Sequence, residues 1–295
     1  MSYCINPKCL NRNNPEQLEL CQSCGSSLLI NGRYRVVECL RESNPAYPTD
    51  IFVVKDFSCE EANWGTLKVL KVLKASRHPE WLRLFKEAAR ALIWLRHPGI
   101  PRVEPDGYFQ FFTHQNFQKL HCLVMERVAG INLNDWLKTN QIDSQDLIIE
   151  WLEQLTDLLA YLHKFQIIHR DIKPSNLILR SNNQLALIDF GTVAIAQSDR
   201  VKVGTIGYAA PEQIEGQAVL QSDFFALGRT FVHLLTGTHP NLLATHAKTG
   251  QLMWRASAPQ ISEPLAELID QLMELLPENR PKNIHSLRKR LAQLR

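Results

Sequence analysis

The residues between His169 and Gly191 include three kinds of side chain that can act together on a phosphate ester. Asp171 is a carboxylate that can accept a proton. Asn176 and Asp189 offer hard oxygen atoms, which suit a magnesium ion already bound to phosphate oxygens. Lys173 offers a positive point charge for a phosphoryl group in transfer. The pattern predicts phosphoryl-transfer chemistry that depends on Mg²⁺.

Two short apolar runs must position these groups. They cover residues 177–179 and 185–188 and are separated by the polar residues 181–184, so they predict a β-hairpin. The ionisable residues stand just outside the two strands. Loops held by a rigid hairpin are where catalytic groups are usually placed.

The motif His-Arg-Asp-x-Lys-x-x-Asn starting at His169, followed by Asp-Phe-Gly at Asp189, resembles the eukaryotic-type protein kinases. The resemblance implies that Asp171 is the catalytic base and that Lys173 lies near the γ-phosphate of ATP. It also implies Asn176 and Asp189 as the Mg²⁺ ligands. The expected fold class is α+β, with a β-rich small lobe and a helical large lobe.

The composition agrees with one two-lobed domain and a small N-terminal segment. The chain has 295 residues, of which 45% are hydrophobic, and a net charge of +3. This balance demands neither nucleic acid nor a membrane surface as a partner. The sequence contains no run of about 18 apolar residues and no apolar stretch typical of a secretory signal at its start. We therefore expect a cytoplasmic protein without a membrane span.

Four of the seven cysteines lie within the first 24 residues and form two close pairs. Two pairs separated by a short loop suit a tetrahedral zinc site, and a segment this short needs a metal or disulfides to stay folded. We expect a zinc-ribbon-like module over residues 1–28, similar to the four-cysteine segment of some bacterial kinases. A redox-switched thiol pair and a disordered tail are the alternatives. The four candidate zinc ligands are Cys4, Cys9, Cys21 and Cys24.

The predicted kinase domain covers residues 33–295, and its small lobe covers residues 33–128. Three strands are expected, at residues 33–40, 51–56 and 64–73. Kinases cover the ATP phosphates with a glycine-rich turn between the first two strands, but no glycine lies between Gly32 and Gly65. Residues Asn44, Ala46 and Thr49 stand at the expected glycine positions. Weaker or differently shaped phosphate cover is the expected consequence.

The third strand offers two lysines for the α- and β-phosphates of ATP. Lys71 fits the family pattern best, and Lys68 must face the other side of the strand. A helix is expected over residues 81–96, and the resemblance to kinases implies that it presents a glutamate to this lysine. Glu87 is our choice for this glutamate. A count back from His97 without gaps instead places Ala88 at the glutamate position, and Glu87 lies about 100° around the helix from it.

Residues 121–130 match the fifth strand and the hinge of the kinase small lobe. The resemblance implies Met125 as the gatekeeper. It also implies that the backbones of Glu126 and Val128 bind the adenine of ATP.

The large lobe, residues 129–295, begins with a helix that Ser144 can cap. By resemblance, Thr205 bridges Asp171 and Lys173, and Asp223 holds the backbone of the catalytic loop. Glu212 and Arg280 are expected to form a structural ion pair, a prediction that rests on both motifs standing in kinase order.

Arg170 precedes the catalytic aspartate, and this arginine often binds an activation-loop phosphate in the family. Thr192 and Ser198 are the hydroxyl residues between Gly191 and Gly204. One of these two is the expected phosphorylation site.

The sequence thus favours a serine/threonine kinase that transfers the γ-phosphate of Mg-ATP to a protein hydroxyl in bacterial signalling. The main alternative is a pseudokinase that serves as a binding or scaffold module, because the phosphate-covering loop lacks glycine. A small-molecule phosphotransferase is disfavoured, because the segment Gly204–Glu212 is of the protein-substrate type.

Overall fold

The computed structural model describes residues 1–41, 47–58, 64–74, 78–114, 117–196 and 201–294. The chain forms two compact units. The first contains residues 1–96 and 101–127, and the second contains residues 97–100 and 128–295. None of the helices in the described part of the chain has the length and apolarity that crossing a bilayer would require.

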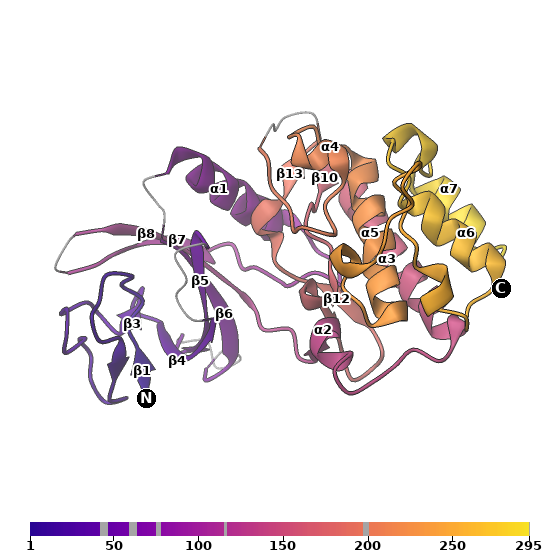
Figure 1. Ribbon diagram of the computed structural model, residues 1–295. Helices are drawn as coiled ribbons and strands as arrows, with labels where there is room; N and C mark the ends of the chain where they lie inside the picture. Colours follow the sequence, from indigo (N-terminus) through magenta and orange to yellow (C-terminus); the bar gives the residue numbers. More distant parts are fainter. Residues whose placement is uncertain (42–46, 59–63, 75–77, 115–116, 197–200, 295) are drawn as a thin grey trace. The chain divides into compact units, whose positions relative to one another are not determined.

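The first unit is built on one antiparallel sheet of six strands (Figure 1). The predicted third strand begins three residues late, at Leu67. Gly65 has a positive φ of 78° and its N–H donates to the carbonyl of Asp56 at 2.7 Å, so Trp64 and Gly65 form a turn before Leu67. In spatial order the strands are β3 (Leu29–Ile30), β4 (Tyr34–Arg41), β5 (Thr49–Asp56), β6 (Leu67–Leu73), β8 (Lys119–Glu126) and β7 (Tyr108–Phe112).

One face of this sheet is covered by the N-terminal segment, which contains β1 (Ser2–Tyr3) and β2 (Asn13–Asn14). Ile5 and Ile30 are each 1% exposed and belong to the same buried cluster as Phe52 of β5. Part of the N-terminal segment therefore belongs to the hydrophobic core of the sheet, whereas Cys4, Cys21, Cys24 and Leu28 form a separate buried cluster.

Helix α1 (Pro79–Trp94) belongs to the same unit and is amphipathic, as the sequence predicts. It ends two residues before the predicted boundary, because Leu95 is already extended with φ −67° and ψ 134°. The side chains that it buries are Leu84, Phe85, Ala88, Ala89 and Leu92.

The second unit is mainly helical. Helix α3 begins after Ser144, whose hydroxyl accepts from the N–H of Asp146 at 3.1 Å, which confirms the predicted cap. Helix α5 ends at Gly237, which has the left-handed φ of 63°. The helices are α2 (Leu133–Trp136), α3 (Gln145–Lys164), α4 (Pro211–Ile214), α5 (Leu220–Thr236), α6 (Glu263–Leu272) and α7 (Ile284–Leu291).

The predicted hairpin is formed by β11 (Leu177–Leu179) and β12 (Leu185–Leu187), which pair antiparallel. Strand β9 (Ile131–Asn132) adds to β11, and a separate ribbon joins β10 (Ile167–Ile168) to β13 (Ala194–Ile195). The chain enters the hairpin through the 3₁₀ turn at Pro174–Asn176 and leaves it through Asp189. The hairpin thus positions the candidate catalytic groups, which lie just before β11 and just after β12.

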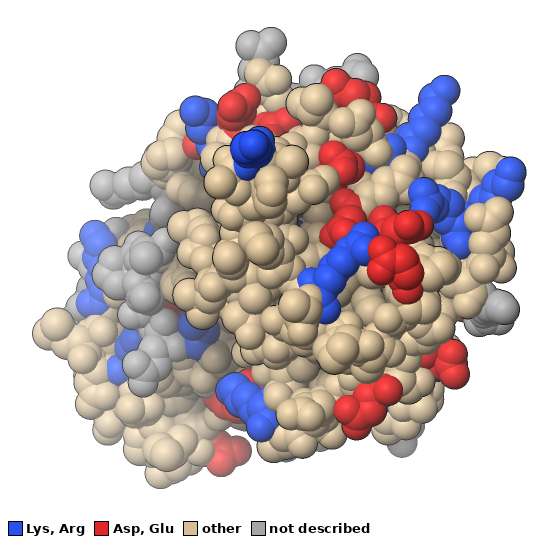
Figure 2. All heavy atoms as spheres, turned by 45° about the vertical axis from the view of Figure 1, so that its right-hand side comes forward, with Lys and Arg blue, Asp and Glu red and all other residues tan. Residues whose placement is uncertain are grey.

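On the face of the molecule in Figure 2, lysine and arginine side chains lie interspersed with aspartate and glutamate. Exposed ion pairs of the described residues include Lys138 with Asp135 and Arg288 with Asp157. Such exposed pairs contribute little to stability.

Candidate active site

Three side chains of the second unit form a closed ring of hydrogen bonds around Asp171. The ammonium of Lys173 donates to Asp171 Oδ2 at 2.8 Å and to Thr205 Oγ1 at 2.7 Å. Thr205 Oγ1 donates to Asp171 Oδ1 at 2.6 Å. The predicted bridge by Thr205 is therefore present. The ring fixes the carboxylate of Asp171 from two sides and places a positive charge beside it.

Asn176 is tied to the same carboxylate. Its Nδ2 donates to the backbone carbonyl of Asp171 at 2.8 Å and to Asp171 Oδ2 at 2.9 Å. Because these bonds use the amide nitrogen, Oδ1 is the atom of Asn176 that can serve as a metal ligand.

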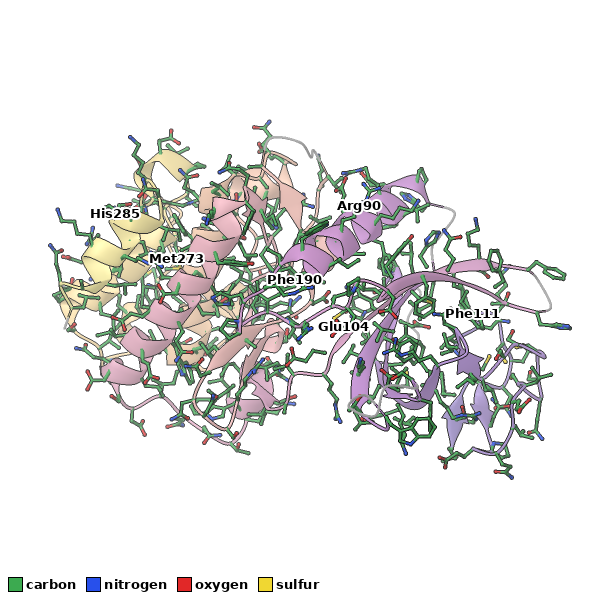
Figure 3. The ribbon with its side chains drawn as sticks, turned by 180° about the vertical axis from the view of Figure 1, so that it is seen from behind. Arg90, Glu104, Phe111, Phe190, Met273 and His285 are labelled. Atoms are coloured by element: carbon green, nitrogen blue, oxygen red, sulfur yellow. The ribbon has the colours of Figure 1, made fainter. Side chains whose placement is uncertain are left out.

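Asp189 has a left-handed backbone, with φ 62° and ψ 67°, and its carboxylate accepts from the N–H of Gly191 at 3.3 Å. Such a conformation costs about 1–3 kcal/mol in a residue other than glycine and is concentrated at functional sites. The next residue, Phe190 (labelled in Figure 3), is buried. It packs edge-on against the His169 ring, with centroids 4.8 Å apart. The packing of Phe190 helps hold Asp189 in this backbone.

A buried carboxylate binds the backbone of the catalytic loop, as predicted. Asp223 of α5 is fully buried and accepts from the backbone N–H of His169 at 2.9 Å and of Arg170 at 3.0 Å. His163 Nε2 lies 3.2 Å from the same carboxylate. Asp223 therefore fixes the backbone just before Asp171.

Arg170, the residue expected to bind an activation-loop phosphate, contacts the backbone of that segment. Its side chain is buried, and its guanidinium donates to the backbone carbonyls of Thr192 and Val193. The hydroxyl of Thr192 donates to the carbonyl of His169 at 3.0 Å. Ser198 lies outside the described residues, so phosphorylation of this segment stays a prediction.

The predicted ion pair between Glu212 and Arg280 is present and bidentate, with distances of 2.7 and 2.9 Å. The Arg280 side chain is fully buried. Burial would raise the pKa of Glu212, but hydrogen bonds from Arg280 and Ser222 outweigh it and hold that pKa below its ordinary value. The pair links the segment after Thr205 to the helical part of the unit.

In the first unit, the two candidate lysines of β6 face opposite sides of the sheet. Lys68 Nζ lies 3.0 Å from the buried carboxylate of Asp56, which also binds Arg33. Its neighbours at alternate positions, Leu70 and Val72, belong to the core under the N-terminal segment. Lys71 is 8% exposed and must face the other side.

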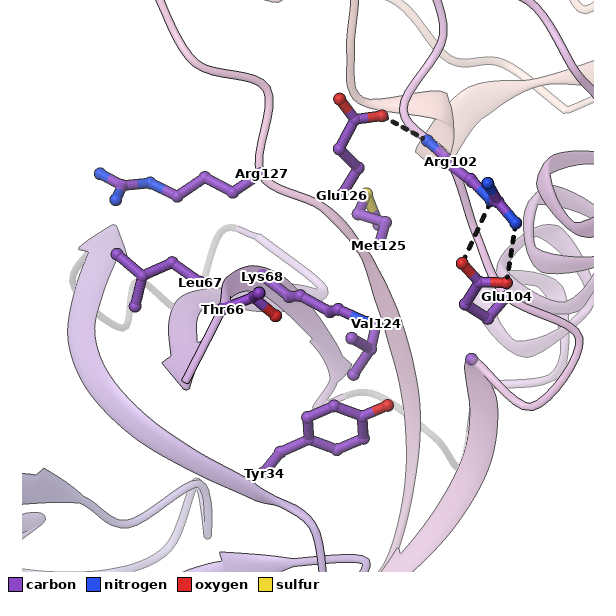
Figure 4. Close-up of a pocket in the computed structure, with 11 residues that line it drawn as sticks. Tyr34, Thr66, Leu67, Lys68, Arg102, Glu104, Val124, Met125, Glu126 and Arg127 are labelled. Carbon is purple, nitrogen blue, oxygen red and sulfur yellow. Dashed lines mark hydrogen bonds and ion pairs between the residues drawn. The ribbon is translucent and has the colours of Figure 1, made fainter. Parts of the chain in front are cut away.

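A pocket of about 260 Å³ opens on the Lys68 side (Figure 4). Lys68, Tyr34 and Glu126 contribute to its wall, whereas Lys71 does not. An ion pair between Arg102 and Glu104 borders it at 3.1 Å. This pocket is therefore not the place where Lys71 would meet a nucleotide.

Two of the nucleotide residues implied by the family lie at the end of β8. Met125 is paired with Val69 of β6, two residues from Lys71, and is half-buried. The carboxylate of Glu126 accepts from the N–H of Arg102 at 3.0 Å. Val128 begins the second unit.

Glu87 of α1 does not reach Lys71. Its two carboxylate oxygens each accept from Arg83, one turn earlier, at 2.9 Å, and no contact joins Glu87 to Lys71 among the residues that the structure describes. Ala88, the alternative by count, is 4% exposed and packs in the core. Glu87 stands one residue before the buried Ala88, so its carboxylate lies away from the buried face of α1. The structure therefore does not bring these two predicted residues together.

The glycine-free loop is only partly described. Asn44 and Ala46 lie outside the described residues. Thr49 starts β5, pairs with Leu73 and accepts from the Arg41 guanidinium through its carbonyl at 3.2 Å. Thr49 is thus part of the sheet rather than of a phosphate-covering turn.

The four N-terminal cysteines converge, and all their sulfur atoms lie within 4.8 Å of one another. The Sγ atoms of Cys4 and Cys24 are 3.6 Å apart, as are those of Cys9 and Cys21. These distances exclude disulfides, whose S–S length is about 2.05 Å. They fit four thiolates around zinc, because a Zn–S length of about 2.3 Å separates tetrahedral ligands by about 3.8 Å.

The surroundings of Cys24 favour a thiolate, whereas burial raises the pKa values of Cys4 and Cys9. Burial raises the pKa of Cys24, but hydrogen bonds, chiefly to Ser26, lower it to about 6. The Ser26 hydroxyl lies 3.3 Å from Cys24 Sγ and accepts from the N–H of His114. Asn14 Nδ2 donates to Cys21 Sγ at 3.5 Å. Such bonds orient metal ligands in protein sites.

Comparison with known proteins agrees with this geometry. Residues 51–291 match the family model described as protein kinase domain, so the chain belongs to the protein kinase family. Serine/threonine-protein kinase B of Synechocystis sp. is 34% identical over 96% of this chain and 50% of its own length. Serine/threonine-protein kinase C of the same organism is 35% identical, over 85% of this chain and 48% of its own length.

A third relative, serine/threonine-protein kinase PknA of Nostoc sp., is 31% identical over 85% of this chain and 45% of its own length. The chain thus spans about half the length of the curated relatives that it matches.

Proposed function

We propose that this chain is a protein serine/threonine kinase that transfers the γ-phosphate of Mg-ATP to a hydroxyl group of a protein. The observation that carries this function is the ring that joins Asp171, Lys173 and Thr205, with Asn176 bonded to the same carboxylate. No observation among the described residues favours the alternative of a kinase fold that only binds partners.

In this mechanism Asp171 accepts the proton of the substrate hydroxyl as the oxygen attacks phosphorus. Lys173 lies 2.8 Å from that carboxylate and can balance charge on the phosphoryl group in transfer. Asn176 Oδ1 and the Asp189 carboxylate would hold Mg²⁺, which neutralises charge on the phosphate oxygens when bound. The rest of catalysis is positioning, which Thr205 and Asp223 supply by fixing Asp171 and its backbone.

For the nucleotide, we propose that Lys71 binds the α- and β-phosphates and that the backbones of Glu126 and Val128 bind adenine beside Met125. Glu87 stays our candidate for the helix carboxylate that supports Lys71, and it would have to exchange Arg83 for the lysine. We further propose that the protein acts in the cytoplasm, where ATP is available and thiols are kept reduced.

The lysine assignment predicts opposite results for two matched substitutions. Lys71→Met is expected to weaken ATP binding by about tenfold or more, because a charge-assisted contact to phosphate is worth roughly 1.5–3 kcal/mol. Lys68→Met breaks the contact to Asp56 and is expected to lower stability while ATP affinity stays within about twofold, because Lys68 faces the other side of β6. Calorimetric titration with a non-hydrolysable ATP analogue and Mg²⁺ measures the nucleotide affinity of both variants. An affinity loss confined to Lys68→Met would reverse the assignment.

We propose that residues 1–28 form a zinc-ribbon-like module in front of the kinase domain, residues 33–295, with lobes at 33–128 and 129–295. The convergence of four sulfur atoms within 4.8 Å supports zinc over a redox-switched pair. Cys4, Cys9, Cys21 and Cys24 would hold the ion as thiolates, and zinc would supply the cross-link between the two halves of the module.

Zinc analysis gives a direct expectation. Protein purified without chelators should contain one zinc ion per chain, and Cys24→Ser should lose most of it, since one of four ligands is removed. Cys122→Ser is the matched control, because Cys122 is a buried residue of the sheet core outside the cluster. A metal-free wild-type protein, or equal zinc in the Cys24 variant, would refute the zinc site.

A further inference from the structure

Arg229 of α5 is a half-buried arginine without an ion-pair partner in the described ranges of the chain. Its guanidinium lies over the Phe225 ring, 4.9 Å from the centroid. Its Nε is buried and has no hydrogen-bond partner among the described residues. Burial lowers the pKa of Arg229 to about 10, so the group is still protonated at neutral pH. A buried cationic N–H without an acceptor is costly, and such groups call for an unobserved partner.

The position of Arg229 connects it to the catalytic ring. Phe225, Arg229 and His233 are spaced by four residues and therefore share one face of α5. At one end of this face, Phe225 also contacts Arg280, the partner of Glu212. At the other end, His233 Nδ1 lies 2.5 Å from the hydroxyl of Tyr208. The face thus lies against the segment that follows Thr205.

Two histidines contact Tyr208, whose pKa is raised by burial and by the charge of Asp171. His239 lies edge-on to Tyr208, with ring centroids 5.1 Å apart, and 5.6 Å from the His233 ring. Burial and the neighbouring His239 lower the pKa of His233 to about 4, so His233 is neutral at physiological pH. No carboxylate pairs with Arg229, His233 or His239 within the described parts of the chain.

Among the described residues, Glu212 is tied to this face through Arg280 and the pair is neutral, so Arg229 leaves a positive charge on the face. An arginine in such a place attracts an anion and disfavours a cation.

An exposed surface next to this face can receive a peptide. A Cβ atom added to Gly207 would lie 2.8 Å from His239 Cε1 and 3.3 Å from the N–H of Asn241, so the two chain segments touch. Their neighbouring residues Ile206 and Leu242 are 74% and 77% exposed. Ile206 lies between Thr205, whose hydroxyl donates to Asp171, and Tyr208, whose hydroxyl lies beside His233 of α5. A peptide along Ile206 would therefore run from the acceptor site toward α5.

We propose that Arg229 is a specificity-determining residue that binds an anionic group of the protein substrate, a carboxylate or a phosphate a few residues from the acceptor hydroxyl. This inference rests on the proposed kinase function and adds the substrate class to it. Phe225 positions the guanidinium by stacking, and His233 and His239 leave the site without a competing negative charge.

Equilibrium binding of peptides tests the proposal without requiring catalysis. Fluorescently labelled peptides with alanine at the acceptor position would carry glutamine, glutamate, phosphoserine or lysine at the flanking positions. Wild type is expected to bind the glutamate or phosphoserine peptide about tenfold more tightly than the glutamine peptide, as one charge-assisted contact allows. The glutamate and phosphoserine arms distinguish a carboxylate from a phosphate ligand.

Arg229→Met keeps an apolar stem over Phe225 and is expected to abolish this preference, while Arg229→Lys should keep part of it. Arg288→Gln, at an exposed pair with Asp157, is the matched control and should keep the full preference. Because the preference is a ratio within one variant, a partly unfolded variant does not distort it.

Absence of an anion preference in wild type, or its survival in Arg229→Met, would overturn the proposal. Phosphate transfer without anion preference would refute the subsite alone. Anion preference without any phosphate transfer would refute the kinase function and leave the subsite standing.

Discussion

Replacing Asp171 by asparagine is expected to lower kcat for peptide phosphorylation by about 10²–10⁴-fold, the usual contribution of a positioned general base. The KM for ATP should change little, because Asp171 acts on the acceptor hydroxyl. Asparagine has the shape of aspartate but cannot take up the hydroxyl proton. The asparagine side chain has one acceptor oxygen and one NH₂ donor. If the NH₂ group takes the place of Oδ2, the hydrogen bonds that Lys173 and Asn176 donate there are lost. Steady-state ADP release with a serine peptide measures the loss.

Asp157→Asn is the control for this prediction, since Asp157 is an exposed partner of Arg288 on the same unit. Its kcat should equal that of wild type. Equal rates for Asp171→Asn and wild type would exclude Asp171 as the base and remove the mechanism proposed above.

Arg280→Met is expected to lower the free energy of unfolding by about 3–5 kcal/mol, the cost of breaking a buried ion pair from one side. The Glu212 carboxylate would then be buried without its bidentate partner. Urea unfolding at pH 7, followed by far-UV circular dichroism, measures the change. Arg288→Met removes one member of an exposed pair and should cost less than about 1 kcal/mol.

The pH dependence of this pair has a definite sign. The pKa of Glu212 is held below its ordinary value of 4.5, so the stability that the pair contributes is present above pH 4.5 and is lost as the pH falls through the lower folded-state value. Arg280→Met should therefore lose its extra instability in acid. An equal stability difference between variant and wild type at pH 7 and below pH 4 would contradict this account.

Local motifs explain why much of the second unit could be predicted. The ring around Asp171, the Asp223 support and the Glu212 pair each depend on residue types at fixed positions in the kinase motifs, and each is present. The hairpin followed from two apolar runs with a polar turn. These features need no knowledge of distant packing beyond the order of the motifs.

Other features depended on packing that the sequence pattern does not encode. A one-residue ambiguity in α1 decides whether Glu87 or Ala88 faces inward, and helical periodicity alone leaves it open. The N-terminal segment looked like a separate appendage, but Ile5 enters the core of the sheet. A long-range contact of this kind has no local signal.

Arg229 was also missed, although one signal was available. It is the one arginine within the strongly apolar run of α5, four residues after Phe225 and four before His233. A charged residue inside such a run is worth explaining, because cations are seldom buried without a partner.

Mass spectrometry of a single turnover with ¹⁸O-labelled γ-phosphate tests the proposed phosphoryl transfer directly. With Mg-ATP and an acceptor peptide, wild type should place the labelled phosphate on a serine or threonine hydroxyl in step with ADP formation, and Asp171→Asn should not. Labelled phosphate released only to water, or a peptide left unmodified while ATP stays intact, would contradict the proposal that this chain is a protein serine/threonine kinase.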